Sequence, residues 1–228
     1  VLSFKDYKTE KYLGGILAIA RHLSSFCKKV DIVSFIGDKG EEKEFIKKRL
    51  EKNINFFFIK KKNSKTIIKQ RIIDQIDNKK LIGIYSVDDK SISETEQNLF
   101  IKKIKENSRK SDLLILADYG HGIFTQKVIK EISKIKKYKS LNAQINSTNM
   151  GFHNIRKYQN INSVIINAGE LRHEMRDREG NIEKLGKKLK QDLKAKNITV
   201  TMGRAGVQMV QKNDLFNCPA FGLETVDK

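Results

Sequence analysis

The feature that most constrains this chain is a regular alternation of amphipathic segments and short apolar runs. Apolar residues recur with a helical period in five segments, at residues 13–26, 41–52, 93–109, 126–137 and 182–196. Between them lie six runs rich in branched residues, at residues 30–36, 55–59, 113–117, 141–145, 164–166 and 198–201. Strands that alternate with helices are typical of a mainly parallel sheet covered on both faces, so we predict an α/β fold.

One section breaks this alternation. Residues 66–77 and 80–88 have the pattern of two successive strands joined at Asn78-Lys79, with no helix between them. Together with an extended start over residues 2–12, they predict a small sheet that stands off the main one. Ser93 and Glu96 have the spacing of a capping box, which supports a helix start after this section.

Length and composition favour one domain over residues 1–228. A chain of 228 residues that is 39% hydrophobic can bury one core, and no run approaches the roughly 18–20 apolar residues of a membrane span. The first residues, from Val1, do not have the basic and then apolar pattern of a signal peptide, so we predict a cytoplasmic protein without a membrane partner. Cys27 and Cys218 lie in apolar surroundings without metal spacing, and we expect buried, reduced thiols.

The formal net charge of +19 raises the hypothesis of a nucleic-acid-binding protein. The lysines, however, are spread over the polar faces of most amphipathic segments rather than gathered in one stripe. Nucleic-acid binding therefore remains the less favoured alternative. A general attraction for phosphorylated ligands is the milder consequence of the charge.

Three glycine motifs follow one another along the chain: Gly14-Gly15, Asn167-Ala168-Gly169-Glu170, and Thr201-Met202-Gly203-Arg204-Ala205-Gly206. Glycines let the backbone approach a ligand, and a helix N-terminus offers free amides to it. Side-chain oxygens of the second motif suit a hard cation such as Mg²⁺. Taken singly, each motif has a plain structural alternative, namely a turn, a helix cap and a hairpin.

Two strand ends carry polar residues. Asp118 follows the strand at residues 113–117, where open α/β sheets collect their ligands, although it could equally bond turn amides. Asn146 lies in the amide-rich segment Gln144-Ile145-Asn146-Ser147-Thr148-Asn149, which precedes His153 and Lys157-Tyr158. Asn146 could bond a sugar phosphate or fix a turn.

In this order and spacing, the motifs resemble those of the ribokinase-like (PfkB) carbohydrate kinases over nearly all of residues 2–228. The amide-rich segment resembles a subgroup related to the kinase half of bifunctional ADP-heptose synthases. The resemblance implies ATP and Mg²⁺ as cofactors and a lid formed by residues 2–12 and 66–88, through which a homodimer could form. It also implies roles for individual residues: substrate binding by Gly14, Gly15, Asp118 and Asn146; nucleotide binding by Thr201, Gly203, Arg204 and Gly206; metal binding by Asn167 and Glu170, with Asp227 near a monovalent cation.

The sequence departs from the family pattern at several positions. Ala18 stands where an asparagine is expected, and His121 replaces a lysine in Asp118-Tyr119-Gly120-His121-Gly122. The family's Gly-Ala-Gly-Asp, whose aspartate is the catalytic base, does not occur in these residues. We therefore expect the chain to be trimmed at both ends, with the base beyond Lys228, and to be inactive alone.

The resemblance implies ATP-dependent phosphorylation of a hydroxyl of a sugar or sugar phosphate, and a heptose phosphate is favoured. A second interpretation is a non-catalytic relative that binds nucleotide or sugar.

Overall fold

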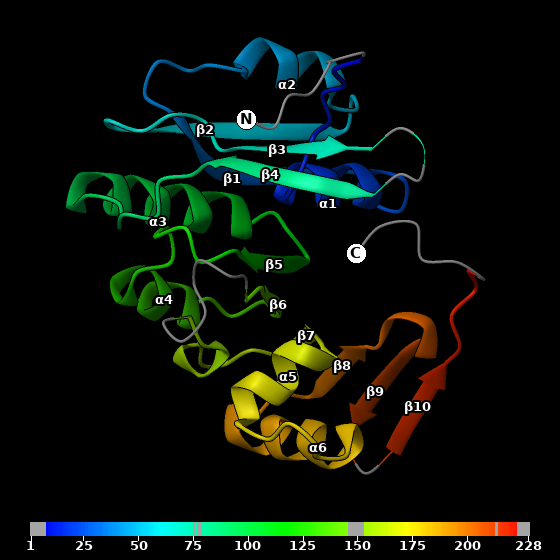
Figure 1. The fold of residues 1–228 in the computed structure, drawn as a ribbon. Coiled ribbons are helices and arrows are strands. Elements are labelled where there is room, and N and C mark those ends of the chain that lie inside the picture. Colours follow the sequence, from blue (N-terminus) through cyan, green and yellow to red (C-terminus); the bar gives the residue numbers. More distant parts are fainter. Residues whose placement is uncertain (1–7, 75, 77–78, 146–152, 213, 223–228) are drawn as a thin grey trace. The chain divides into compact units, whose positions relative to one another are not determined.

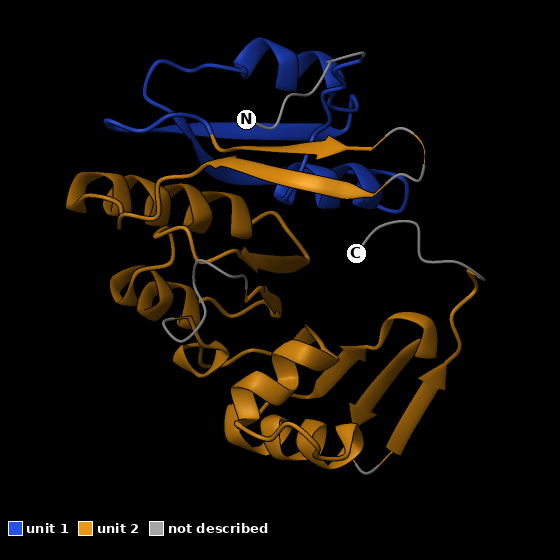
Figure 2. Ribbon diagram, in the orientation of Figure 1, with its two compact units in different colours: residues 1–66 blue, residues 67–228 orange. Residues whose placement is uncertain are grey.

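The computed structural model of the protein describes residues 8–74, 76, 79–145, 153–212 and 214–222 (Figure 1). The chain forms two compact units, residues 1–66 and residues 67–228 (Figure 2). Each unit is described below by itself. The predicted α/β class is confirmed, since parallel strands alternate with helices along the chain.

The first unit is a two-stranded parallel sheet with two helices. Its elements in order are α1 (Ile16–Ser24), β1 (Val30–Gly37), α2 (Lys43–Arg49) and β2 (Ile54–Lys61). Strand β1 pairs with β2 from Val30 opposite Ile54. Leu13, Ile36 and Ile46 form one buried cluster, and Ala20, Ile32 and Ile54 form another. Of the extended start expected over residues 2–12, residues 8–12 form neither helix nor strand, and residues 1–7 lie outside the described residues.

The second unit begins with the predicted hairpin, β3 (Ile68–Ile73) and β4 (Lys80–Ser86), which are antiparallel with Ile68 opposite Ser86. A six-stranded sheet follows in the order β10-β9-β8-β7-β6-β5. Its parallel strands are β5 (Leu113–Asp118), β6 (Tyr138–Ala143), β7 (Ser163–Asn167) and β8 (Asn197–Thr201). Two antiparallel strands, β9 (Val207–Gln211) and β10 (Asp214–Cys218), extend one side of this sheet.

Among the described residues, four α-helices and two short 3₁₀ turns accompany this sheet. They are α3 (Glu94–Ser108), α4 (Gln126–Ser133), η1 (Ile155–Lys157), α5 (Ala168–Met175), α6 (Ile182–Leu193) and η2 (Gly203–Ala205). Helix α6 packs on β8 and β9, and α5 packs on β7. The predicted capping box of α3 is confirmed, since Ser93 N donates to Glu96 Oε2 at 2.7 Å and Glu96 N donates to Ser93 Oγ at 3.3 Å.

Three expectations need correction. Cys27 and Cys218 are exposed rather than buried, because Cys27 follows the C-terminal end of α1 and Cys218 ends the outermost strand β10. A sixth helix, α5, joins the five predicted ones; only its start at Asn167 was expected. Helix α4 ends at Ser133, several residues before the predicted end at Lys137. Within the described part of the chain, no helix is long and apolar enough to cross a membrane.

Candidate functional site

The parallel strands of the second unit bring several of the predicted residues to one edge of the sheet. Asp118 ends β5, Asn167 ends β7, and Thr201 ends β8. Asn167 lies opposite Thr201 in the β7–β8 register, and Asp118 lies opposite Ala143 in the β5–β6 register. The carboxyl edge of a parallel sheet is where open α/β folds bind ligands. Asn146 and Asp227 lie outside the described residues.

Glu170 is a buried carboxylate that closes the N-terminus of α5. Asn167 Oδ1 accepts from Glu170 N at 2.8 Å, and Glu170 Oε2 accepts from Asn167 N at 3.0 Å. Glu170 Oε1 also accepts from Ile145 N at 3.1 Å, which ties the segment after β6 to this helix. Burial raises the pKa of Glu170, and the two backbone amides oppose that rise. Glu170 is thus both part of the helix cap and a buried hydrogen-bond acceptor.

Asp118 is the centre of a second buried cluster. Its Oδ2 accepts from Tyr158 Oη at 2.6 Å and from Lys157 Nζ at 2.8 Å, and its Oδ1 accepts from Gly120 N at 2.9 Å. Burial of Asp118 opposes its ionisation, but Lys157, His153 and the hydrogen bonds outweigh burial and lower the pKa of this carboxyl. Asp118 is therefore a charged group at neutral pH although only 3% of its surface is exposed.

The protonation states of the residues around Asp118 follow from their burial and their contacts. Burial raises the pKa of Tyr158 and lowers the pKa of His153, so the phenol and the imidazole are both neutral. Lys157 Nζ lies 3.3 Å from His153 Nδ1. An ammonium can only donate, so Nδ1 is the acceptor and the imidazole proton resides on Nε2. His153 Nε2 lies 3.7 Å from Asp118 Oδ2.

Two consecutive residues after β6 connect these clusters. Gln144 N donates to Asp118 O at 2.8 Å, and Ile145 N donates to Glu170 Oε1 at 3.1 Å. The backbone carbonyl of Asp118 and the carboxylate of Glu170 therefore accept hydrogen bonds from neighbouring amides of one short segment. Sequence reasoning proposed Asp118 and Glu170 separately but assigned no role to His153, Lys157 or Tyr158. The signal available was the run of residues 153–158, in which five of six residues are polar.

Residues 201–206 form a turn between β8 and β9. Gly203 has φ +57° and Gly206 has φ +85°, and Met202 N donates to Gly206 O at 2.8 Å. A Cβ placed on Gly206 would lie 2.1 Å from Cys218 O, whereas a Cβ placed on Gly203 would meet nothing within 4 Å. Gly206 is thus required by packing against the end of β10, while Gly203 presents an open backbone that a ligand could approach.

Alanine substitutions should separate these two glycines. We expect Gly206→Ala to reduce the free energy of unfolding by about 3 kcal/mol, because backbone strain and a steric clash add. Gly203→Ala, the matched control, should cost about 1 kcal/mol through its left-handed backbone alone. Urea denaturation of both variants measures the difference. Equal losses would show that the contact with Cys218 O does not govern Gly206.

Gly14 and Gly15 belong to the first unit, at the start of α1. Gly15 is the N-cap with φ 55° and no side-chain cap, and a Cβ on Gly14 would meet nothing within 4 Å. This open helix start can offer backbone amides to hydroxyl groups. Ala18 is exposed on the same helix and supplies no polar group. In the second unit, His121 stands where the family pattern has a lysine. Its Nδ1 lies 2.7 Å from Asp89 Oδ1, so this histidine has a carboxylate partner.

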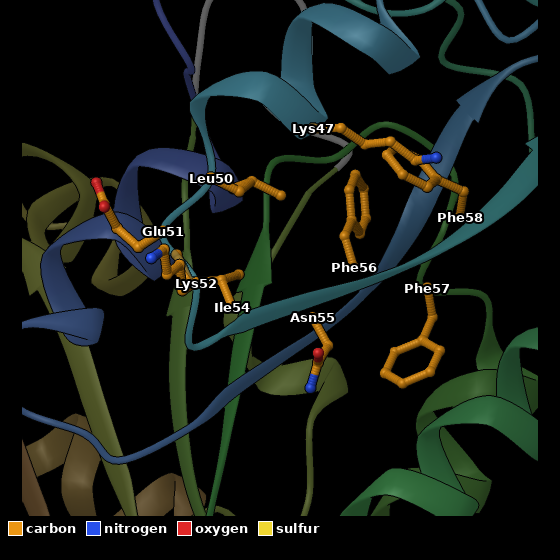
Figure 3. A pocket seen from close by; sticks show the side chains of 9 residues that line it. All are labelled: Lys47, Leu50, Glu51, Lys52, Ile54, Asn55, Phe56, Phe57 and Phe58. Atoms are coloured by element: carbon orange, nitrogen blue, oxygen red, sulfur yellow. The ribbon is translucent and has the colours of Figure 1, made fainter.

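A separate cavity of about 650 Å³ lies in the first unit between α2 and β2 (Figure 3). It is lined by Lys47, Leu50, Glu51, Lys52, Ile54, Asn55, Phe56, Phe57 and Phe58. None of the predicted site residues that the structure describes contributes to its wall.

The described residues fit a hydrated Mg²⁺ better than a directly caged one. They contain no group of three or more His, Cys, Asp or Glu side chains suited to hold a metal. Asn167 Oδ1 and both Glu170 oxygens each accept one backbone amide, and each oxygen retains a second lone pair. Mg²⁺ usually keeps several waters, and such waters can donate to these lone pairs.

Comparison with known proteins defines the class. Residues 4–228 match the pfkB family of carbohydrate kinases, so the chain belongs to this family. Membership of a kinase family implies ATP as the phosphoryl donor. Among curated proteins, the chain is similar to the bifunctional protein HldE of Campylobacter jejuni subsp. doylei, with 31% identity over 230 residues, 100% of this chain and 47% of the relative. HldE of Helicobacter pylori strain HPAG1 is 27% identical over 232 residues, 96% of this chain and 47% of the relative.

The chain therefore spans about half the length of the curated relatives it matches.

Solved structures of other proteins have the same fold. Phosphofructokinase-2 from Escherichia coli in complex with fructose-6-phosphate has a TM-score of 0.70 at 16% identity, covering 92% of this chain and 69% of that chain. Ribokinase from Thermotoga maritima has a TM-score of 0.62 at 18% identity, covering 92% and 65% respectively. The fold is thus that of the ribokinase-like kinases.

Proposed function

We propose that the protein transfers the γ-phosphate of ATP to a hydroxyl of a sugar phosphate, with a heptose phosphate as the favoured substrate. Family membership and the HldE relatives support this choice of substrate class. The observation that carries the proposal is the row of Asp118, Glu170 and Thr201 along the carboxyl edge of four parallel strands. We place the reaction in the cytoplasm, where ATP is supplied.

In this proposal the second unit binds the donor. The open backbone at Gly203, with the Thr201 hydroxyl and the Arg204 guanidinium, holds phosphate oxygens of the nucleotide. Asn167 and Glu170 hold the water shell of Mg²⁺, which neutralises charge on the transferring phosphate when bound. Glu170 serves this purpose only when ionised. Burial raises the pKa of Glu170 above the ordinary value of 4.5, so activity should begin to fall at a higher pH than it would with an ordinary glutamate.

The acceptor sugar is proposed to bind at Gly14 and Gly15, through the amides at the start of α1. Ala18 offers no hydrogen bond, so the sugar contacts differ from the common family pattern. The hairpin β3–β4 is proposed as a lid that excludes water, which would otherwise compete with the sugar hydroxyl for the phosphate. The same hairpin is our candidate for a homodimer contact.

We assign the catalytic base to no residue of this chain. The tetrapeptide Gly-Ala-Gly-Asp, to which the family resemblance assigns proton transfer, does not occur in the 228 residues. We accordingly propose that these residues alone bind nucleotide without transferring phosphate. Asn146 and Asp227 remain proposed contacts for the substrate and for a monovalent cation.

A phosphoryl-transfer assay tests the proposed function. A protein that contains this chain is incubated with radiolabelled ATP, Mg²⁺ and one of three acceptors: a heptose phosphate, fructose 6-phosphate or ribose. We expect labelled product mainly from the heptose phosphate, and none after chelation of Mg²⁺. Binding of ATP without transfer to any acceptor would favour the non-catalytic relative. Steeply salt-dependent RNA or DNA binding that ATP does not affect would favour the nucleic-acid alternative.

A further inference from the structure

The cluster of Asp118, His153, Lys157 and Tyr158 has more polar groups than a helix cap or a turn requires. Its central residue, Asp118, ends β5 at the carboxyl edge of the sheet, and its backbone carbonyl accepts from the amide of Gln144, next to the Ile145 amide that Glu170 accepts. Asp118 is 3% exposed, Tyr158 is 2% exposed and His153 is 6% exposed. Only the Lys157 side chain, at 29% exposure, reaches solvent to a substantial extent.

Asp118 is poorly suited to touch a ligand itself. Its Oδ1 accepts the Gly120 amide, and its Oδ2 accepts both the Tyr158 hydroxyl and the Lys157 ammonium. Oδ1 keeps one lone pair, but the residue is only 3% exposed, so a ligand hydroxyl would have to enter a buried site to reach it. The geometry instead makes Asp118 a support that fixes the position of Lys157.

The groups that remain available in the cluster are donors. Lys157 directs two of its three ammonium protons at Asp118 Oδ2 and His153 Nδ1. His153 Nε2 carries a proton, is buried, and makes no hydrogen bond within the part of the chain that the structure describes. Its 3.7 Å separation from Asp118 Oδ2 is too long for one.

We propose that Lys157, assisted by the Nε2 proton of His153, binds an oxygen of the substrate's phosphate group and thereby selects phosphorylated over free sugars. A phosphate oxygen only accepts hydrogen bonds, which matches a site whose buried carboxylate already accepts three hydrogen bonds and whose available groups donate. A sugar hydroxyl also donates, and the acceptor atoms of the cluster, on Asp118 and Tyr158, are buried. This inference rests on the proposed function and names the residues that recognise the substrate's existing phosphate.

Calorimetric titration tests the proposal, with a heptose phosphate and the corresponding free heptose as the two ligands. We expect the wild type to bind the phosphorylated sugar more tightly. Lys157→Met should weaken binding of the phosphorylated sugar by about 10- to 100-fold and leave the free sugar unchanged. Lys157→Arg should retain most of the preference. Lys103→Met is the control, because Lys103 is similarly exposed at 36% and is paired with Glu106 at 3.1 Å.

A folding defect is separated from a binding defect by a second variant. Lys157→Met leaves the Asp118 carboxylate without its cation, so Lys157→Met combined with Asp118→Asn removes both charges, and thermal unfolding checks its fold. The preference for phosphate should be lost in the double variant as well. Equal weakening of both ligands, or an unchanged preference, would overturn the role of Lys157. A wild type that binds neither sugar would overturn the proposed function too, whereas equal binding of both sugars would overturn only this inference.

Discussion

Replacing Asp118 by alanine is expected to lower the free energy of unfolding by about 3–5 kcal/mol. The carboxylate is the common acceptor for Tyr158 Oη at 2.6 Å and Lys157 Nζ at 2.8 Å. Its removal leaves an ammonium and a buried hydroxyl without their acceptor, and each carries an unrecovered desolvation cost. Urea denaturation followed by circular dichroism measures the change in the unfolding free energy.

The stability that Asp118 contributes should depend on pH. The folded state lowers the pKa of Asp118, so its contribution to stability is present above the unfolded value of 3.8 and is lost as the pH falls through the folded value. The difference between wild type and variant should therefore shrink in strong acid. Glu106→Ala is the control, because the exposed pair of Glu106 with Lys103 should be worth less than about 1 kcal/mol. Similar losses in the two variants would contradict the central role of Asp118.

Replacing Glu170 by glutamine is expected to reduce phosphoryl transfer by about 10- to 100-fold and to raise the Mg²⁺ concentration needed for half-maximal rate. The amide keeps the size of the side chain but loses the charge and one acceptor. Stability should change by less than about 1 kcal/mol, because the lost hydrogen bond is offset by removing a charge whose burial raises its pKa. Initial rates across a Mg²⁺ titration measure the effect.

Helix α3 offers a matched control for this variant. Glu96 forms the same capping box with Ser93 that Glu170 forms with Asn167, but it lies at the start of α3 rather than at the carboxyl edge of the sheet. Glu96→Gln should therefore leave the Mg²⁺ dependence unchanged. If the two variants lose activity to the same extent, Glu170 acts only as a helix cap.

The alternation of amphipathic segments and apolar runs predicted the parallel part of the fold, because each helix or strand pattern lies within a short stretch of sequence. Strands β5, β7 and β8 lie within a few residues of the predicted runs, and the hairpin β3–β4 was predicted from its two alternating arms. Strand β10 was not predicted, since it has only five residues, is interrupted by the polar residues Asp214 and Asn217, and is largely exposed. Pairing with β9 stabilises this strand, and that contact is not visible in local composition.

The candidate site was predictable where it consists of a contiguous motif. The capping box of Asn167 and Glu170 follows from two residues three positions apart. The partners of Asp118 could not be predicted, because Tyr158 lies 40 positions away and meets it only after β5 and β6 pair. The exposure of Cys27 and Cys218 was missed for a related reason, since apolar neighbours such as Phe26 are themselves 77% exposed.

The chain carries two cysteines in all, and the structure places one in each compact unit, Cys27 in residues 1–66 and Cys218 in residues 67–228. Both thiols are free and exposed. They are therefore a natural pair of attachment points for fluorophores or spin labels, without any engineered substitution. Energy transfer between the labels would report the separation of the units directly, and titrating ATP or a sugar phosphate would show whether ligands change it.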